Sequence, residues 1–444
     1  MSTLIRIKRK LTSFQIIILG FLGVILLGTI LLMLPVASRT GQVTSFGDAL
    51  FTSTSAVCVT GLVVQDTGTY WSVFGQGIIL LLIQIGGMGV ITVAAAFFML
   101  SGRKISLMQR STMQEAISAP KVGGIVRLTG FVIKITFLIE LTGAAVMAPV
   151  FCRDFGMKGL WMALFHSISA FCNAGFDLMG TVSPGSSLTY YATEPLLNIT
   201  IMLLVIVGGI GFLTWEDIKT NRFHFRKYRM QSKVILCTTT ILLILPAIYF
   251  YFFEFDTQAP GARVWYSLFQ AVSPRTAGFN TVDLTTLNES GQYITIFLML
   301  IGGSPGSTAG GMKTTTVAVL FAAAIATFRR KEDTVFFGRR IDNDVVKNAA
   351  TILVMYLVLF FFGGLAISII EGLPMLTSLF ETASAVGTVG LSLGVTASLG
   401  TVSRLILIVL MFLGRVGGLT LIFAALSGIQ KNVSKLPREK ITVG

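Results

Sequence analysis

Long apolar runs, separated by short basic segments, dominate the hydrophobic pattern of the chain. Eight runs are long enough to cross a membrane, because about 20 apolar residues span the hydrocarbon core. The expected spans are 14–36, 73–100, 126–150, 196–218, 234–255, 292–327, 347–371 and 403–427. The first run exceeds the apolar core of a signal peptide, which is about 7–15 residues long. The pattern therefore predicts an all-α polytopic membrane protein with an uncleaved first span.

Short apolar segments inside four outer connections repeat one motif. They read ALFTSTSAVCVTGL (49–62), ALFHSISAFCNAGFDL (163–178), SLFQAVSPRTAGFNTVDL (267–284) and SLFETASAVGTVGLSL (378–393). Each opens with a small residue, Leu and Phe, and runs to one glycine: Gly61, Gly175, Gly278 and Gly390. These glycines are 114, 103 and 112 residues apart, about a quarter of the chain each time. The period predicts four units of span, re-entrant helix, glycine loop and span.

The second span of each unit carries a glycine-rich patch. The patches read QIGGMGVIT (84–92), VGGIGFLT (207–214), IGGSPGSTAGG (301–311) and LGRVGGLT (413–420), and the third is the longest. We expect the units to divide the chain into a cytosolic N-terminus 1–12, repeats 13–102, 103–220, 221–330 and 331–428, and a cytosolic tail 429–444.

Composition and charge support a membrane location. Only 12% of the 444 residues are charged, against about a quarter in soluble domains. Most Lys and Arg residues lie in five segments on one side of the expected spans: 6–10, 103–127, 219–233, 329–347 and 431–440. This asymmetry predicts that both termini are cytoplasmic. It also explains the net charge of +14 without a nucleic-acid partner.

Four re-entrant helices suggest a cation site. Irregular backbone at membrane depth is tolerated where it is buried or lines a water-filled cavity, so the loops should surround one pseudo-fourfold axis. Each helix C-terminus carries about half a negative charge. The glycine after each helix lets carbonyl oxygens turn toward the axis, where they replace the hydration shell of a cation.

The strings VCVTG, FCNAG, SPRTAG and VGTVG, one per repeat, give the chain a resemblance to the Trk/Ktr/HKT potassium transporters over nearly its whole length. Its length most resembles the membrane subunit of bacterial Ktr systems. The resemblance implies a K+-channel-like fold and potassium uptake through a central pore, with K+ held at filter carbonyls. The implied filter residues are Val59, Thr60, Gly61, Asn173, Ala174, Gly175, Thr276, Ala277, Gly278, Thr388, Val389 and Gly390, within segments 57–61, 171–175, 273–278 and 386–390.

Two details qualify the filter. Glycine at position 61 favours potassium, because plant relatives with serine there tend toward sodium. The third loop is one residue shorter, since Phe269 to Gly278 spans nine steps where the other copies span ten. Its register is therefore the least certain of the four.

The resemblance also implies an intramembrane gate at 302–313, beneath the filter, with Arg415 as its charged partner. The implied gate residues are Gly302, Gly303, Ser304, Pro305, Gly306, Ser307, Thr308, Gly310, Gly311, Lys313 and Arg415. The alternative is that these glycines only allow close helix packing.

The family further implies a homodimer in the bacterial plasma membrane, on a separate cytosolic ring of regulator-of-conductance type that binds ATP or ADP. Sodium is a candidate activator, and we expect no organic cofactor in this chain. The basic inner loops and the tail KLPREK (435–440) suit either docking of that ring or contact with membrane lipids.

Two other functions fit parts of the sequence. G-G-S-P-G matches the nucleophile elbow of hydrolases, with Ser304 as nucleophile and His166 as base, although the strand–turn–helix setting is missing. An ion-coupled secondary transporter could use Glu140, Lys134 or Lys313, and for Glu140 pairing and proton coupling both remain open. Asp66, Asp177, Asp283 and Glu381 are expected at the outer mouth.

Overall fold

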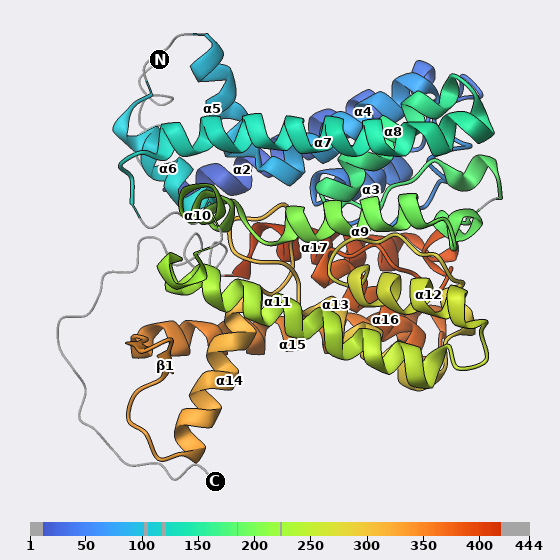
Figure 1. Ribbon diagram of the computed structural model, residues 1–444. Helices are drawn as coiled ribbons and strands as arrows, with labels where there is room; N and C mark the ends of the chain where they lie inside the picture. Colours follow the sequence, from blue (N-terminus) through green and yellow to red (C-terminus); the bar gives the residue numbers. More distant parts are fainter. Residues whose placement is uncertain (1–11, 102–104, 118–120, 184, 223, 419–444) are drawn as a thin grey trace.

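The structure is a computed structural model that describes residues 12–101, 105–117, 121–183, 185–222 and 224–418. The predicted terminal segments 1–12 and 429–444 lie outside these residues, apart from Thr12, and so does the end of the predicted span 403–427. Within the described residues the chain is almost entirely helical, which confirms the all-α prediction. Its long helices run roughly parallel across Figure 1.

The first span of each repeat is one long apolar helix. The four are α2 (Ser13–Met33), α7 (Ile125–Phe155), α11 (Met230–Tyr249, continued by a π-helical turn Phe250–Glu254) and α15 (Asn343–Glu371). Each is long and apolar enough to cross a membrane. Thr12 starts α2 with a capping box, in which the Thr12 hydroxyl accepts from the Gln15 N–H and the Gln15 side chain accepts in return.

The short re-entrant segments form helices that cannot span a bilayer. They are α3 (Phe46–Val57), α8 (Lys158–Phe171), α12 (Pro260–Val272) and α16 (Met375–Gly387). All four lie in the right-hand half of Figure 1, away from the side that carries α10, α14 and β1. We call them the pore helices.

The second span of each repeat is broken. The pieces are α4 (Val73–Met88) with α5 (Val90–Leu100), α9 (Pro195–Gly209) with α10 (Phe212–Asn221), α13 (Glu289–Leu300) with α14 (Thr314–Phe328), and α17 (Thr401–Val416). The first two pairs bend by 94° and 98°. The spans expected over 73–100 and 196–218 are therefore each two helices joined at a sharp bend.

The break falls at one equivalent glycine in three of the repeats. Gly89, Gly211 and Gly417 have φ angles of 87°, 88° and 87°, with ψ of 132°, 143° and 140°. A side chain strongly disfavours this backbone region, so glycine allows the helix to end inside a continuous apolar run. In the third repeat the loop 301–313 replaces the single glycine.

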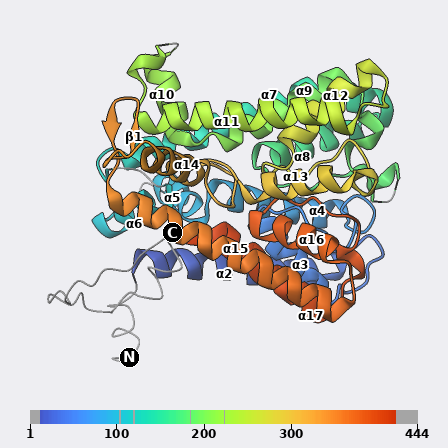
Figure 2. The ribbon, with the colours of Figure 1, turned by 90° about the horizontal axis from the view of Figure 1, so that it is seen from below.

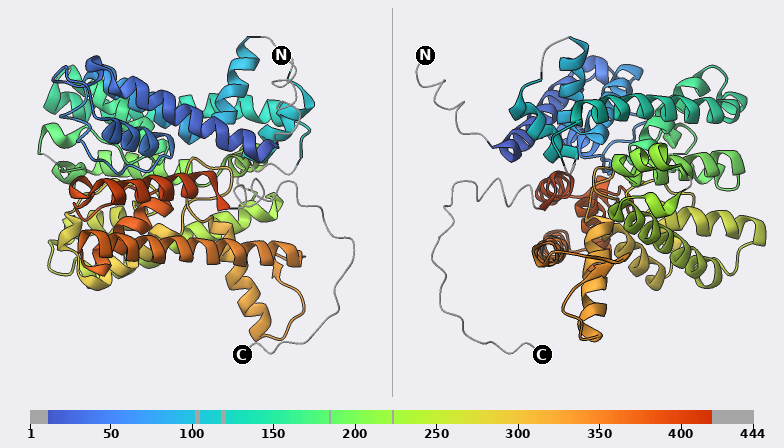
Figure 3. Two further views of the ribbon diagram at one scale, coloured as in Figure 1. Left: turned by 180° about the vertical axis from the view of Figure 1, so that it is seen from behind. Right: turned by 60° about the vertical axis from the view of Figure 1, so that its left-hand side comes forward.

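The four repeats close into a ring. The second span of each repeat packs against the pore helix of the following repeat: α4 on α8, α9 on α12, α13 on α16, and α17 on α3. Figure 2 shows the same helices from below, again running across the view, and Figure 3 shows the first two repeats stacked on the last two. Because the last contact returns to the first repeat, the C-terminal ends of the pore helices meet around one axis.

Helix α6 and a small hairpin lie on the side opposite the pore helices (Figure 1). Helix α6 (Leu107–Ile117) packs against α2 and α5. A two-stranded hairpin, β1 (Val335–Phe336) with β2 (Arg339–Arg340), follows α14. The basic segments 219–233 and 329–347 are on this side as well (Figure 1).

Close packing of α4 on the first pore helix leads to a stability prediction. A methyl group on Gly86 would lie closer than 3.0 Å to the Val57 carbonyl, whereas one on Gly77 of the same helix meets nothing within 4 Å. Overpacking costs about 1–3 kcal/mol, so Gly86→Ala should lower the thermal unfolding temperature in detergent. Gly77→Ala should leave it unchanged or raise it, because alanine favours helix by up to about 1 kcal/mol. Equal unfolding temperatures for the two variants would contradict this packing.

Candidate functional site

After each pore helix the backbone adopts the same unusual conformation. Among the described non-glycine residues, few have a positive φ, and four of them stand two positions before the repeat glycines: Val59, Asn173, Thr276 and Thr388, at φ between 52° and 68°. The glycines follow at φ of 89°, 68°, 80° and 95°. Positive φ is rare for residues with a side chain. Its recurrence at four equivalent positions shows that the four loops share one fold.

The four glycine turns touch each other in a closed ring. A methyl group on any of these glycines would lie closer than 3.0 Å to a carbonyl oxygen of the neighbouring repeat. The pairs are Gly61 with Ala174, Gly175 with Ala277, Gly278 with Val389, and Gly390 with Thr60. The carbonyls that precede the glycines therefore gather around the central axis, and no side chain fits between adjacent turns.

The third loop reaches this ring although it is one residue shorter. In three repeats a pore-helix serine carbonyl accepts from the N–H five residues later, at 2.8 Å; these carbonyls belong to Ser55, Ser169 and Ser384. In the third repeat the Ser273 carbonyl accepts from Ala277, only four residues later, at 2.9 Å. Because this hydrogen-bonded turn is one residue shorter, Gly278 occupies the same place in the ring as the other three glycines.

The hydroxyls of these serines tie each loop to its pore helix, a role that the sequence analysis missed. Ser55 accepts from the Gly61 N–H at 3.1 Å, and Ser384 accepts from the Gly390 N–H at 3.0 Å. Ser169 and Ser273 donate instead to the carbonyls of Phe176 and Phe279. The available signal was a serine five or six positions before each repeat glycine.

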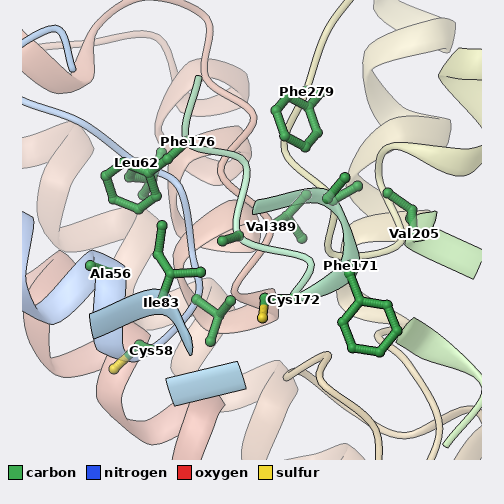
Figure 4. Close-up of a cluster of buried hydrophobic side chains, with 14 of the residues drawn as sticks. Ala56, Cys58, Leu62, Ile83, Phe171, Cys172, Phe176, Val205, Phe279 and Val389 are labelled. Atoms are coloured by element: carbon green, nitrogen blue, oxygen red, sulfur yellow. The ribbon is translucent and has the colours of Figure 1, made fainter. Parts of the chain in front are cut away.

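Apolar side chains pack around the loops. Figure 4 shows Leu62, Phe176 and Phe279, each directly after a repeat glycine, together with Val389 of the fourth repeat. All four are buried in one hydrophobic cluster. This shell packs closely around the loop backbones and holds them in place.

An outer cavity of about 270 Å³ is bounded by all four repeat glycines and by Asp66, Asp177 and Asp283. Burial, with a smaller contribution from the nearby Asp66 carboxylate, raises the pKa of Asp177 to about 7. The negative charge of Asp177 is therefore lost as the pH falls through neutrality.

Glu381 does not reach the outer cavity, contrary to expectation. It lies on the pore helix α16, where its carboxylate accepts hydrogen bonds from the Ser392 hydroxyl, the Leu393 N–H at 3.1 Å and the Thr396 hydroxyl at 2.7 Å. These bonds fix the loop after the fourth glycine turn, so Glu381 is structural.

The loop 301–313 crosses the axis beneath the glycine ring. Ser304 donates its N–H to the Gly209 carbonyl at 2.9 Å, and Gly311 donates to the Gly414 carbonyl at 3.2 Å. A methyl group on Gly310 would lie closer than 3.0 Å to the Thr388 hydroxyl. The loop is thus held by the second and fourth repeats, directly below the fourth filter segment.

Arg415 clamps this loop to the first repeat. Its guanidinium donates to the carbonyl of Thr308 in the loop, to Gly86 and, at 3.2 Å, to Gly87 at the end of α4. Lys313 donates within the loop, to Ala309 at 2.8 Å. Two cationic side chains therefore donate to loop and helix carbonyls at membrane depth, where a charge without a partner would be costly.

Thr308 connects the loop directly to the second filter segment. Its hydroxyl lies 3.0 Å from the Phe171 carbonyl and 3.0 Å from the Asn173 amide oxygen. The Asn173 amide nitrogen lies 3.4 Å from the Thr276 hydroxyl of the third segment. The loop is therefore connected through Thr308 and Asn173 to the turns of the second and third repeats.

A second cavity, of about 240 Å³, lies on the other side of the loop. It is bounded by loop residues that include Gly306 and Lys313, by Arg415, and by Glu115 of α6. The order along the axis is outer cavity, glycine ring, loop and inner cavity.

Glu140, in the middle of α7, is paired. Its carboxylate accepts from the Gln84 amide at 3.0 and 3.2 Å and lies 3.8 Å from the Cys172 sulfur. It therefore supports the second filter segment from behind, outside the cavities along the axis.

The pairing that a serine hydrolase needs is not made. The Ser304 hydroxyl bonds the Thr314 hydroxyl at 3.0 Å. Both ring nitrogens of His166 have other partners, the Met162 carbonyl at 2.7 Å and the Leu178 N–H at 3.4 Å. His166 is also stacked on Phe151.

Comparison with known proteins places these features in context. Residues 7–434 match the family model TrkH, described as "Cation transport protein". The chain is 40% identical to the Ktr system potassium uptake protein B of Bacillus subtilis, over 96% of this chain and 95% of that protein. It is 39% identical to the potassium/sodium uptake protein NtpJ of Enterococcus hirae, over 99% of both. The potassium transporter TrkH of Vibrio parahaemolyticus shares the fold, with a TM-score of 0.70 at 21% identity over 91% of this chain and 84% of that one.

The Thr308 hydroxyl gives a prediction about loop mobility. Thr308→Val removes the donor to Phe171 and Asn173, and one hydrogen bond contributes about 0.5–1.5 kcal/mol. Amide hydrogen exchange in 301–313 should therefore be roughly threefold to tenfold faster than in the wild type. Thr308→Ser keeps the hydroxyl and should exchange like the wild type. Equal exchange in Thr308→Val would show that this hydroxyl does not hold the loop.

Proposed function

Because the chain belongs to the TrkH family of cation transport proteins, we propose that it carries potassium ions across a membrane through the axis between its four repeats. The closed ring of glycine turns is the observation that carries this proposal. Two relatives that match nearly the whole chain are named as potassium uptake proteins, which supports potassium as the transported ion.

In this proposal the ion is held by backbone oxygens. The binding set consists of the carbonyls of Val59, Thr60, Asn173, Ala174, Thr276, Ala277, Thr388 and Val389, with the repeat glycines Gly61, Gly175, Gly278 and Gly390 allowing the turn. Carbonyl dipoles replace the hydration shell of the ion. The C-terminal ends of α3, α8, α12 and α16 add negative potential at the same point. In this proposal, selectivity for potassium over other cations depends on how closely the four backbone turns approach each other.

The loop 302–313 and Arg415 form the proposed gate. The loop lies between the two cavities, and Arg415 holds it to α4 through Thr308 and Gly86. A fixed positive charge beneath the filter also opposes a passing cation. Opening then requires that the Arg415 bonds break and the loop moves aside.

A pore accounts for the structure better than an ion-coupled carrier. Coupled carriers with broken helices typically place ionisable groups in the substrate path. Glu140 is instead bonded to Gln84 behind the filter. Lys313 is bonded to loop carbonyls, which fits a gate.

Family membership also supports a proposal for the assembly of this protein and its location in the cell. The name "Ktr system" of one relative implies further subunits in that system. For this chain we include in the proposal a homodimer in a bacterial plasma membrane with both termini in the cytoplasm, controlled by a cytosolic regulator-of-conductance ring that binds ATP or ADP, with sodium as activator. The repeats 13–102, 103–220, 221–330 and 331–428 are its structural units.

The filter proposal is tested with Gly61→Ser. A side chain at position 61 approaches the Ala174 carbonyl and disfavours the required φ of 89°. In liposomes with opposed potassium and sodium gradients, the potassium-to-sodium flux ratio should fall at least severalfold. Gly47→Ser is the matched control, because Gly47 starts α3 in open space. An unchanged ratio in Gly61→Ser would reject backbone coordination at this position.

The gate proposal is tested by removing its contacts. Hydrogen bonds to charged groups contribute about 1.5–3 kcal/mol, so Arg415→Ala should raise cation flux roughly tenfold or more, as should deletion of 305–311. Arg404→Ala is the control on the same helix, because Arg404 pairs with Asp48 at 2.8 Å and does not touch the loop. Wild-type flux in both gate variants would remove Arg415 and the loop from gating.

A further inference from the structure

A basic pocket of about 590 Å³ lies between the start of α7 and the end of α10. Its charged lining consists of Lys121, Arg127, Lys219 and Arg229, with Glu216 as the acidic member. Figure 1 shows α10 beside the left-hand end of α7, on the side opposite the pore helices. By the distribution of Lys and Arg this is the cytoplasmic side of the membrane.

Three of the four cationic groups have no carboxylate partner. Arg229 pairs with Glu216 at 2.7 Å and with Asp217 at 3.5 Å. Lys121, Arg127 and Lys219 form no ion pair with any residue that the structure describes. The Lys219 nitrogen lies 4.5 Å from the centre of the Phe131 ring, where it faces an aromatic surface and no acid. Like charges that share one hollow repel each other, and an anion between them relieves this repulsion.

The start of α7 adds backbone donors to the same pocket. The helix begins at Ile125 after Gly124, which has φ of 82°, and no side chain caps it. Gly123, Gly124 and Ile125 all line the pocket. The Ile125 N–H donates to the Val122 carbonyl at 3.3 Å, so the helix start offers the N–H groups that follow Ile125 and about half a positive charge, which suits a phosphate group.

The rest of the lining is mixed. Thr220 is polar, Ile125, Leu128 and Leu213 are buried, and Phe131 is only partly buried. A soluble phosphate compound would gain little from the Phe131 ring, whereas the acyl chain of a lipid would cover it. Charge and apolar lining together match a molecule with a phosphate at one end and hydrocarbon at the other.

We propose that the basic pocket binds the phosphate headgroup of an anionic phospholipid from the inner leaflet. Lys121, Arg127 and Lys219 contact the phosphate together with the N–H groups that follow Ile125 in α7. The glycerol and the upper acyl chain lie against Phe131, Leu128 and Leu213. Basic hollows between helices on the cytoplasmic side of membrane proteins suit anionic headgroups for this reason. The site is separate from the filter and the gate and does not depend on which cation passes.

Native mass spectrometry of the full-length protein in detergent tests the proposal. The probes are phosphatidylglycerol and phosphatidylcholine with identical acyl chains, titrated separately. The wild type should bind at least one phosphatidylglycerol more tightly than phosphatidylcholine. The double variant Arg127→Gln/Lys219→Gln should bind it roughly tenfold to thirtyfold more weakly.

Three controls make each outcome informative. Arg329→Gln/Lys331→Gln removes the same charge from exposed inner residues outside the pocket and should bind like the wild type. Arg127→Lys/Lys219→Arg keeps the charge and should retain binding, which separates a charge effect from misfolding. Excess inorganic phosphate should not displace the lipid, because it cannot occupy the apolar part of the pocket.

The proposal is overturned by any of three results. If Arg127→Gln/Lys219→Gln retains wild-type phosphatidylglycerol binding, the pocket charges serve another purpose, such as contact with an acidic segment of a protein partner. If both charge-removing double variants lose binding equally, attraction is a general property of the basic surface. If inorganic phosphate displaces the lipid completely, the pocket is a site for soluble phosphate.

Discussion

Close contact between four backbone segments is the constraint on which this structure depends. A methyl group on any repeat glycine would lie closer than 3.0 Å to the carbonyl before the neighbouring glycine, so no side chain fits between them. Oxygen atoms can surround a dehydrated ion only at such short range. The pore helices end at this ring, the serines near their ends fix the loops, and an apolar shell packs around them. Each second span then packs on the next pore helix and closes the ring from outside.

The departures from fourfold symmetry are concentrated in the third repeat. Three repeats break their second span at a single glycine with nearly identical backbone angles. The third repeat replaces that glycine with the loop 301–313. Its Ser273 carbonyl also accepts from the N–H four residues later, where the other repeats span five residues. The proposed gate depends on this asymmetry, because four equal bends would put no loop beneath the ring. The one unequal repeat places its loop there, and Arg415 of the fourth repeat donates to the Thr308 carbonyl of that loop.

The repeat pattern and the glycine spacing were sufficient to predict the helical architecture, the four short helices with their glycine turns, and the interruption in the second span of the third repeat. Contiguous apolar runs hid the breaks at Gly89 and Gly211, because hydropathy does not register one residue with positive φ. Charge alone suggested that Glu381 faces the outer cavity, but its partners Ser392 and Thr396 follow it in the chain by 11 and 15 residues. The bond between Thr308 and Asn173 joins residues 135 positions apart. Such contacts depend on how the repeats are arranged in three dimensions.

The bent second helix of the second repeat has a mechanical consequence. The Phe212 N–H, at the first residue of α10, donates to the Gly306 carbonyl of the loop at 2.8 Å. Helix α10 turns by 98° from α9 at this point. The hydrogen bond to the loop 301–313 therefore lies at the bend between the two helices. Under the proposed gating, a force on α10, from membrane pressure or from a protein bound against it, would reach the loop through this bond.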